Sequence, residues 1–126
     1  MPELKRYKMF INGEWVNSDT KKTFETLNPE NNKPWAVVPE ASASDVDRAV
    51  KAAQNAFEGE WPKLLPKERA RYLRMIGDKL RDNAEHLGKI ETIDTGKLYR
   101  ETYKQANYIA EYLSLIHISE PTRLRS

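Results

Sequence analysis

Residues 90–97, Ile-Glu-Thr-Ile-Asp-Thr-Gly-Lys, constrain this chain most, because two helical patterns meet there. Apolar side chains recur at helical intervals through residues 73–90, and a second helical pattern covers residues 98–113. Glycine directly after the last periodic residue is a helix C-terminus signal, since it accepts the left-handed backbone that ends a helix. We therefore predict helices joined by a turn at Gly96. The Asp94 carboxylate lies near a negative dipole end, so either turn amides or a cation must offset it.

A hairpin is predicted near the N-terminus, over residues 9–16. Asn12-Gly13 separates two short apolar runs there. This dipeptide is typical of a type I′ turn, in which both central residues take positive φ. The preceding residues 1–8 are charged and short of apolar side chains, so we expect them to form a mobile arm.

Two further strands are expected before the first helix. Residues 23–27 alternate in polarity and carry β-branched and aromatic side chains, which favours a strand. Asn28-Pro29 and Asn31-Asn32, followed by Pro34, indicate turns. Residues 35–38 then form a short strand that Pro39 closes.

The first helix has a recognisable beginning and end. Ser42 or Ser44 is the expected N-cap, with Asp45 or Asp47 completing a capping box. Gly59 is expected to end this helix. Its apolar stripe, at helical spacing, consists of Val46, Ala49, Val50, Ala53 and Phe57.

Two or three more helices follow. Pro66 suits the first turn of the next helix, and Asp82-Asn83 interrupts the pattern that continues from it. The apolar stripe of this segment consists of Leu73, Ile76, Leu80, Ala84, Leu87 and Ile90. The core-facing side of the last helix is expected to carry Leu98, Thr102, Ala106, Ile109 and Leu113. The fold class is therefore α/β, with a hairpin and short strands ahead of three or four helices.

Composition narrows the possible functions. The 126 residues carry a net charge of +2, which is too small to indicate a nucleic-acid or polybasic membrane partner. There is no cysteine, which excludes a disulfide, a thiolate metal site and a cysteine nucleophile within this chain. No apolar run approaches the roughly 20 residues that span a bilayer. A charged N-terminus unlike a signal peptide makes the cytoplasm the expected location.

Short motifs in sequence order resemble the aldehyde dehydrogenase superfamily. Each motif alone is weak, but together they keep the family's order and spacing over residues 9–113. They are Phe10-Ile11-Asn12-Gly13-Glu14-Trp15, Leu27-Asn28-Pro29, Val38-Pro39-Glu40-Ala41, Asp45-Val46-Asp47-Arg48-Ala49-Val50, Ala52-Ala53, Ala56-Phe57, Trp61, Glu68-Arg69-Ala70 and Glu91-Thr92-Ile93-Asp94-Thr95-Gly96-Lys97. The family usually has proline where Leu98 stands.

The resemblance implies that residues 9–113 form the N-terminal part of the family's nucleotide-binding domain. The parent enzyme would oxidise an aldehyde to a carboxylic acid with NAD or NADP, and would be a homodimer or homotetramer. In the family a cysteine attacks the carbonyl, a hydride passes to the nicotinamide, and a glutamate activates water. These residues, the cofactor loop and the oxyanion asparagine belong to later segments. The chain is therefore expected to supply no catalytic and no cofactor-binding residue.

The resemblance also implies a structural monovalent cation, K⁺ or Na⁺. Many family members hold one between the start of the Asn-Pro turn and the aspartate of the Asp-Thr-Gly element. The matching groups here are the backbone carbonyls of Thr26 and Leu27 and the side chain of Asp94. Carbonyl and carboxylate oxygens are suitable ligands for such an ion.

The last segment of the chain departs from the helical pattern. Residues 113–123, Leu-Ser-Leu-Ile-His-Ile-Ser-Glu-Pro-Thr-Arg, are similar to one reading frame of a sequencing-library adapter. We expect residues 114–126 to be a non-native tail without native packing, either coil or a helix continued without an apolar face, and we expect Pro121 to break such a helix. The chain would then be a truncated fragment of its parent, inactive alone.

A different interpretation is a stand-alone small α+β interaction module without catalysis, which would have a self-sufficient core. The truncated-enzyme interpretation predicts apolar helix faces left exposed instead. The one histidine outside the tail, His86, is expected on a solvated surface. Packing roles are expected for the aromatic residues Trp15, Trp35, Trp61, Tyr99, Tyr103, Tyr108 and Tyr112.

Overall fold

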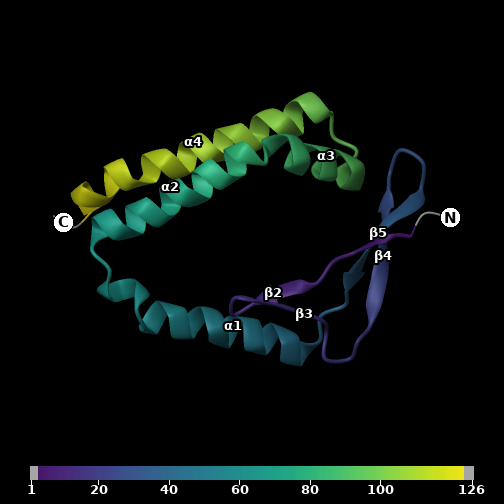
Figure 1. Cartoon of the computed structure of the whole chain (residues 1–126), viewed down its shortest axis with the longest axis horizontal. Helices are drawn as coiled ribbons and strands as arrows, with labels where there is room; N and C mark the ends of the chain where they lie inside the picture. The colour runs from purple at the N-terminus through teal and green to yellow at the C-terminus, as the bar shows by residue number, and fades with distance from the viewer. Residues whose placement is uncertain (1–2, 124–126) are drawn as a thin grey trace. The chain divides into compact units, whose positions relative to one another are not determined.

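The structure, a computed structural model, describes the backbone of residues 3–123 and the side chains of residues 3–115. The chain divides into two units, Met1–Pro62 and Lys63–Ser126. Among the described residues, the first unit contains five strands and one α-helix, and the second contains three α-helices (Figure 1). The predicted α/β class, with a hairpin and short strands ahead of the helices, is confirmed.

The predicted hairpin forms as strands β2 (Met9–Ile11) and β3 (Glu14–Val16). They pair in antiparallel register, with Phe10 opposite Trp15. Asn12 and Gly13 take φ values of 53° and 79°, the left-handed pair that a type I′ turn requires. The predicted turn is confirmed. It could be predicted because the backbone preferences of Asn12 and Gly13 alone specify it.

A three-stranded sheet joins β1 (Lys5–Arg6), β5 (Lys33–Pro39) and β4 (Thr23–Asn28), in that order. The β4–β5 pair is antiparallel, whereas β1 runs parallel to β5. The prediction of a mobile arm over residues 1–8 is therefore wrong for its middle part. A two-residue charged strand has no pattern of its own, and a distant partner, β5, fixes it.

Strand β5 is longer than the predicted 35–38, because it includes Pro34 and Pro39 near its two ends. Proline cannot donate a ladder hydrogen bond, so it is tolerated where a strand lacks a second neighbour. The pairing with β1 involves only Ala36 and Val37, which leaves both prolines outside it. Ala36 and Val37 are the buried hydrophobic residues of this sheet.

Helix α1 (Ala43–Glu58) begins with a complete capping box formed by Ser42 and Asp45, which decides between the two predicted pairs. Gly59 follows its last residue as predicted. The predicted apolar stripe is largely uncovered, since Val50 and Phe57 are 58% and 71% exposed. Exposure of this face agrees with the truncated-enzyme interpretation.

The short helix η1 (Trp61–Lys63) replaces the expected irregular link. Pro66 is the first residue of α2 (Pro66–Asp82). The helix is interrupted at Asn83 before α3 (Ala84–Thr95), as the Asp82-Asn83 signal indicated. Gly96 then takes φ 75° and donates its amide to the Thr92 carbonyl at 2.9 Å. The predicted stop between the two helical patterns is confirmed.

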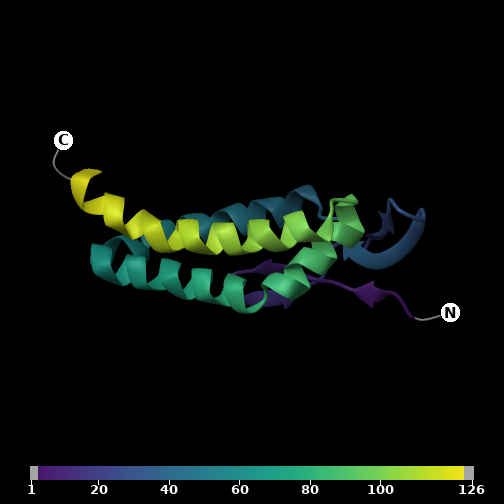
Figure 2. The same cartoon turned by 90° about the horizontal axis from the view of Figure 1, so that it is seen from above.

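Helix α4 (Tyr99–Arg123) lies antiparallel to α2 and contacts both α2 and α3 (Figure 2). Small side chains form this interface: Thr102, Ala106 and Ala110 are buried on α4. Gly77 and Gly88 face them, and a Cβ on Gly77 would lie 2.9 Å from the Ala110 carbonyl oxygen. The helices pack closely because nothing larger separates their backbones.

The predicted core face of α4 is therefore only partly correct. Thr102 and Ala106 are buried as expected, but Leu98 and Ile109 are exposed, and Ala110 takes a central place. The expected break at Pro121 is also wrong, since α4 continues to Arg123. The backbone hydrogen bonds of a helix are local and do not require a buried face. A proline near the last turn removes few of these hydrogen bonds.

The tail prediction concerns mostly residues whose side chains lie outside the described part. Within that part, Leu115 is exposed, whereas Ser114 is half-buried and donates to the Ala110 carbonyl. The assignment of residues 114–126 as non-native stays a prediction. In the part of the chain that the structure describes, no helix is long and apolar enough to cross a membrane.

Candidate functional site

Two of the predicted cation ligands, Thr26 and Leu27, are consecutive residues of β4. An irregularity in the register falls between them, since Thr26 pairs with Ala36 and Leu27 pairs with Pro34. Pro34 has no N–H, so β5 offers no ladder donor from that position. Backbone carbonyls at such a place are chemically suited to a hard cation.

The third predicted ligand, Asp94, belongs to the second unit. It is exposed in the last turn of α3, one residue before the helix ends. The neighbouring cation Lys97 pairs with Glu91, at 2.8 Å between Nζ and Oε1. The structure thus brings Thr26 and Leu27 together within one strand, and the approach of Asp94 to them stays a prediction.

A buried polar cluster that the sequence did not predict surrounds Asp45. Its side chain is fully buried and accepts hydrogen bonds from the Ser42 amide at 2.9 Å and the Ser18 hydroxyl at 2.9 Å. The Asp19 amide lies 3.3 Å from the carboxylate, and Arg48 Nη2 lies 2.6 Å from Oδ1. One carboxylate therefore joins the start of α1 to a segment 26 and 27 residues earlier.

These donors keep Asp45 charged. The Ser42 amide above all, with the Arg48 guanidinium and the Ser18 hydroxyl, holds the pKa of Asp45 far below its usual range, although burial opposes this effect. A carboxyl with a lowered folded-state pKa stabilises the fold above its ordinary pKa. That contribution disappears only as the pH falls through the lowered value, so the cluster is intact near neutral pH.

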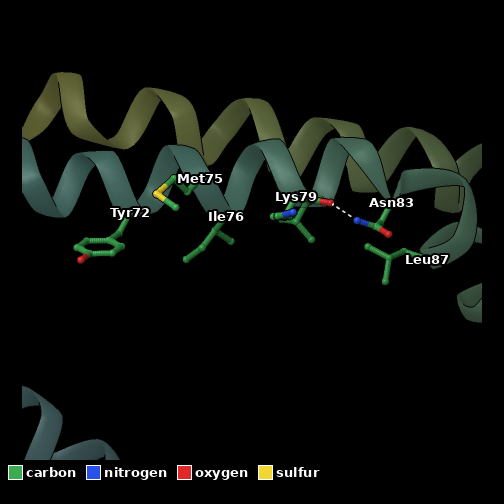
Figure 3. A pocket seen from close by; sticks show the side chains of 7 residues that line it. Tyr72, Met75, Ile76, Lys79, Asn83 and Leu87 are labelled. Carbon is green, nitrogen blue, oxygen red and sulfur yellow. Dashed lines mark hydrogen bonds between the residues drawn. The ribbon is translucent and has the colours of Figure 1, made fainter. Parts of the chain in front are cut away.

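An apolar groove of about 500 Å³ runs along α2 and the start of α3. Figure 3 shows Tyr72 and Ile76 of α2, with Leu87 of α3, on the side that faces away from α4. The polar groups at its edge are Lys79 and Asn83, whose side-chain amide donates to the Lys79 carbonyl at 2.8 Å. Most of its lining is apolar, with Met75 and Leu80 beside the residues named above.

Most of the remaining predicted residues lie at the surface, but Trp35 is half-buried and packs against Tyr7 as expected. His86 is exposed as predicted. The expectation that the tyrosines pack is wrong for Tyr108 and Tyr112, which are mostly exposed, and Tyr99 and Tyr103 contact each other at a ring-centroid distance of 5.9 Å. No group of three or more His, Cys, Asp or Glu side chains is placed to hold a metal among the described residues.

Comparisons with known proteins give the family. The model of the Aldehyde dehydrogenase family matches residues 15–123. The chain belongs to the aldehyde dehydrogenase family. It is 41% identical over 101 residues to Aldehyde dehydrogenase family 2 member C4 of Arabidopsis thaliana, covering 79% of this chain and 20% of that protein. It is also 43% identical over 94 residues to the Mitochondrial 10-formyltetrahydrofolate dehydrogenase of Homo sapiens, covering 74% and 10% respectively.

Solved aldehyde dehydrogenases share the fold. The NAD-dependent aldehyde dehydrogenase from Sinorhizobium meliloti superposes with a TM-score of 0.87 at 29% identity, covering 93% of this chain and 24% of that one. Betaine aldehyde dehydrogenase from Staphylococcus aureus, solved in complex with NAD⁺, gives 0.83 at 36% identity, covering 87% and 22%. The chain thus spans about a fifth of the length of its aldehyde dehydrogenase relatives.

Proposed function

We propose that this chain is the N-terminal part of an aldehyde dehydrogenase that oxidises an aldehyde to a carboxylic acid with NAD⁺ or NADP⁺. The observation that carries the proposal is the family match over residues 15–123. NAD is favoured because the Staphylococcus aureus relative was solved with NAD⁺. The proposal also places the enzyme in the cytoplasm, as a homodimer or homotetramer.

The catalytic and cofactor-binding groups would come from the rest of such an enzyme. This chain has no cysteine to serve as nucleophile. Dinucleotide binding needs a glycine-containing strand-to-helix turn that presents amides to phosphate. The β5–α1 turn has no glycine, since Glu40, Ala41 and Ser42 occupy it. The role that this chain can fill is structural support for the nucleotide-binding domain.

The proposal predicts a clear division of activity. Residues 1–126 alone should reduce neither NAD⁺ nor NADP⁺ with any aldehyde. Residues 1–113 joined to their genomic continuation should reduce one of them, as followed by absorbance of the reduced nicotinamide. Size-exclusion chromatography of the long form would report the dimer or tetramer. Cofactor reduction by the short form, or inactivity of the long form with every aldehyde tried, would contradict the proposal.

The cation site is part of the same proposal. Asp94→Ala in the long form should lower the free energy of unfolding by about 1–3 kcal/mol, since a bound ion or a satisfied carboxylate is removed. It should also weaken the dependence of thermal stability on K⁺ or Na⁺. Asp82→Ala is the matched control, because Asp82 is another exposed aspartate at a helix end. Equal salt dependence in the two variants would refute the role of Asp94.

A further inference from the structure

The hairpin of the first unit is held mainly at its two ends. At its start, the Tyr7 amide donates to the Val37 carbonyl at 2.9 Å and so continues the β1–β5 pairing. At its end, residues 17–22 lead to β4, and we name this segment the strap. Ser18 and Asp19 of the strap bind the buried carboxylate of Asp45.

Between these ends the hairpin packs weakly on α1. Strand β2 contacts α1, yet no hydrogen bond or ion pair joins residues 9–16 to α1 across the part of the chain that the structure describes. Two hollows of about 330 and 380 Å³ lie between them, both lined by Ile11, Asn12 and Ala52. Alanine side chains on the α1 face offer little apolar area to hold the hairpin down.

The hairpin can keep its own shape without α1. Phe10 and Trp15 lie opposite each other with ring centroids 4.9 Å apart, and they are 61% and 67% exposed. A cross-strand aromatic pair and a type I′ turn both stabilise a hairpin internally.

We propose that the hairpin is a flap over α1 and that the Asp45 cluster is the latch that keeps it closed. With the latch open, the hairpin stays attached through Tyr7 at its start and lifts from the alanine face of α1. The charged groups that face the latch are Arg48 on α1 and the carboxylate of Asp45 itself, while the strap contributes the Ser18 hydroxyl and the Asp19 amide. Loss of the Ser18 hydroxyl alone should loosen the latch without removing the helix cap.

The absence of native cysteine makes this proposal directly testable. Ala52→Cys places one half-buried thiol beneath the hairpin, and a bulky maleimide should label it faster when the flap lifts. Ser18→Ala and Asp45→Asn should each speed labelling about tenfold, as expected for losing a hydrogen bond to a charged group. Asp47→Asn is the matched control, because Asp47 makes an exposed ion pair with Lys51 on the same helix, and it should leave the rate within about twofold.

A second reporter separates flap opening from general unfolding. Ala36→Cys puts the thiol in β5, at a fully buried position of the same unit. The proposal requires that Ser18→Ala speeds labelling at position 52 and not at position 36. Equal acceleration at both positions, or none at position 52, would overturn it. If Asp45→Asn lowers the helical circular dichroism signal, the labelling rates of Ser18→Ala alone test the proposal.

Discussion

Gly77→Val should lower the free energy of unfolding of the helical unit by about 2–3 kcal/mol, the cost of overpacking a close helix contact. The Cβ alone would lie 2.9 Å from the Ala110 carbonyl oxygen and 3.4 Å from the Ser114 hydroxyl. A backbone oxygen cannot turn away as a flexible side chain can, so α2 and α4 must separate. Thermal unfolding followed by circular dichroism at 222 nm measures the change.

Gly77→Ala tests this close contact more sharply, because helix propensity and the contact predict opposite changes in the free energy of unfolding. Alanine in an exposed helix interior is worth about 1 kcal/mol more than glycine, so helix propensity predicts stabilisation. The clash with Ala110 predicts the opposite sign. Arg74→Val is the control for a β-branched residue on the exposed face of α2, and it should cost no more than about 0.7 kcal/mol. A Gly77→Val midpoint equal to that of Arg74→Val would show that the close contact does not form.

Thr102→Val should lower the free energy of unfolding by about 1–3 kcal/mol although it preserves side-chain shape, because it leaves buried hydrogen-bond partners unsatisfied. Thr102 is 0% exposed, and its hydroxyl lies 2.9 Å from the Gly88 carbonyl and 3.0 Å from the Tyr99 carbonyl. The Thr92 hydroxyl lies 3.0 Å away and completes the network. Valine leaves the Gly88 carbonyl and the Thr92 hydroxyl facing a methyl group.

Two comparison variants locate the effect in the hydroxyl. Thr102→Ser keeps the hydrogen bonds and removes one methyl, so it should cost about 0.8 kcal/mol. Thr95→Val removes an exposed hydroxyl that donates to the Glu91 carbonyl and accepts from the nearby Lys97 amide, and it should stay within about 0.5 kcal/mol of the parent. If Thr102→Ser proved as costly as Thr102→Val, packing of the methyl and not the hydrogen bonds would explain the effect.

Features that depend on a few neighbouring residues could be predicted well. The Asn12-Gly13 turn, the helix stop at Gly96 and the break after Asp82 are all present as expected. Each is decided by backbone preferences or hydrogen bonds within four or five residues, which a sequence states directly. The family, too, follows from motifs in order, since such motifs need no knowledge of distant contacts.

Features that join distant segments could not be predicted in the same way. The pairing of Lys5 with Ala36 and the hydrogen bond of Ser18 to Asp45 link residues about 30 positions apart. The local sequence of a two-residue charged strand, or of a single serine, does not specify which distant residue it will pair with. The spacing of Ser42 and Asp45 indicated a possible capping box, but it did not indicate that the same carboxylate also binds the strap.

The sequence by itself determined the order of the main elements, most of their turns and ends, and membership of the aldehyde dehydrogenase family. Only the tertiary structure decided which face of each helix is buried. The pattern of the last helix predicted Leu98 and Ile109 in the core beside Thr102 and Ala106, yet both larger residues are exposed, and Ala110 is buried with Thr102 and Ala106 instead. Close approach of two backbones selects the smallest side chains and not the most hydrophobic ones, because volume and not transfer free energy limits what fits between them.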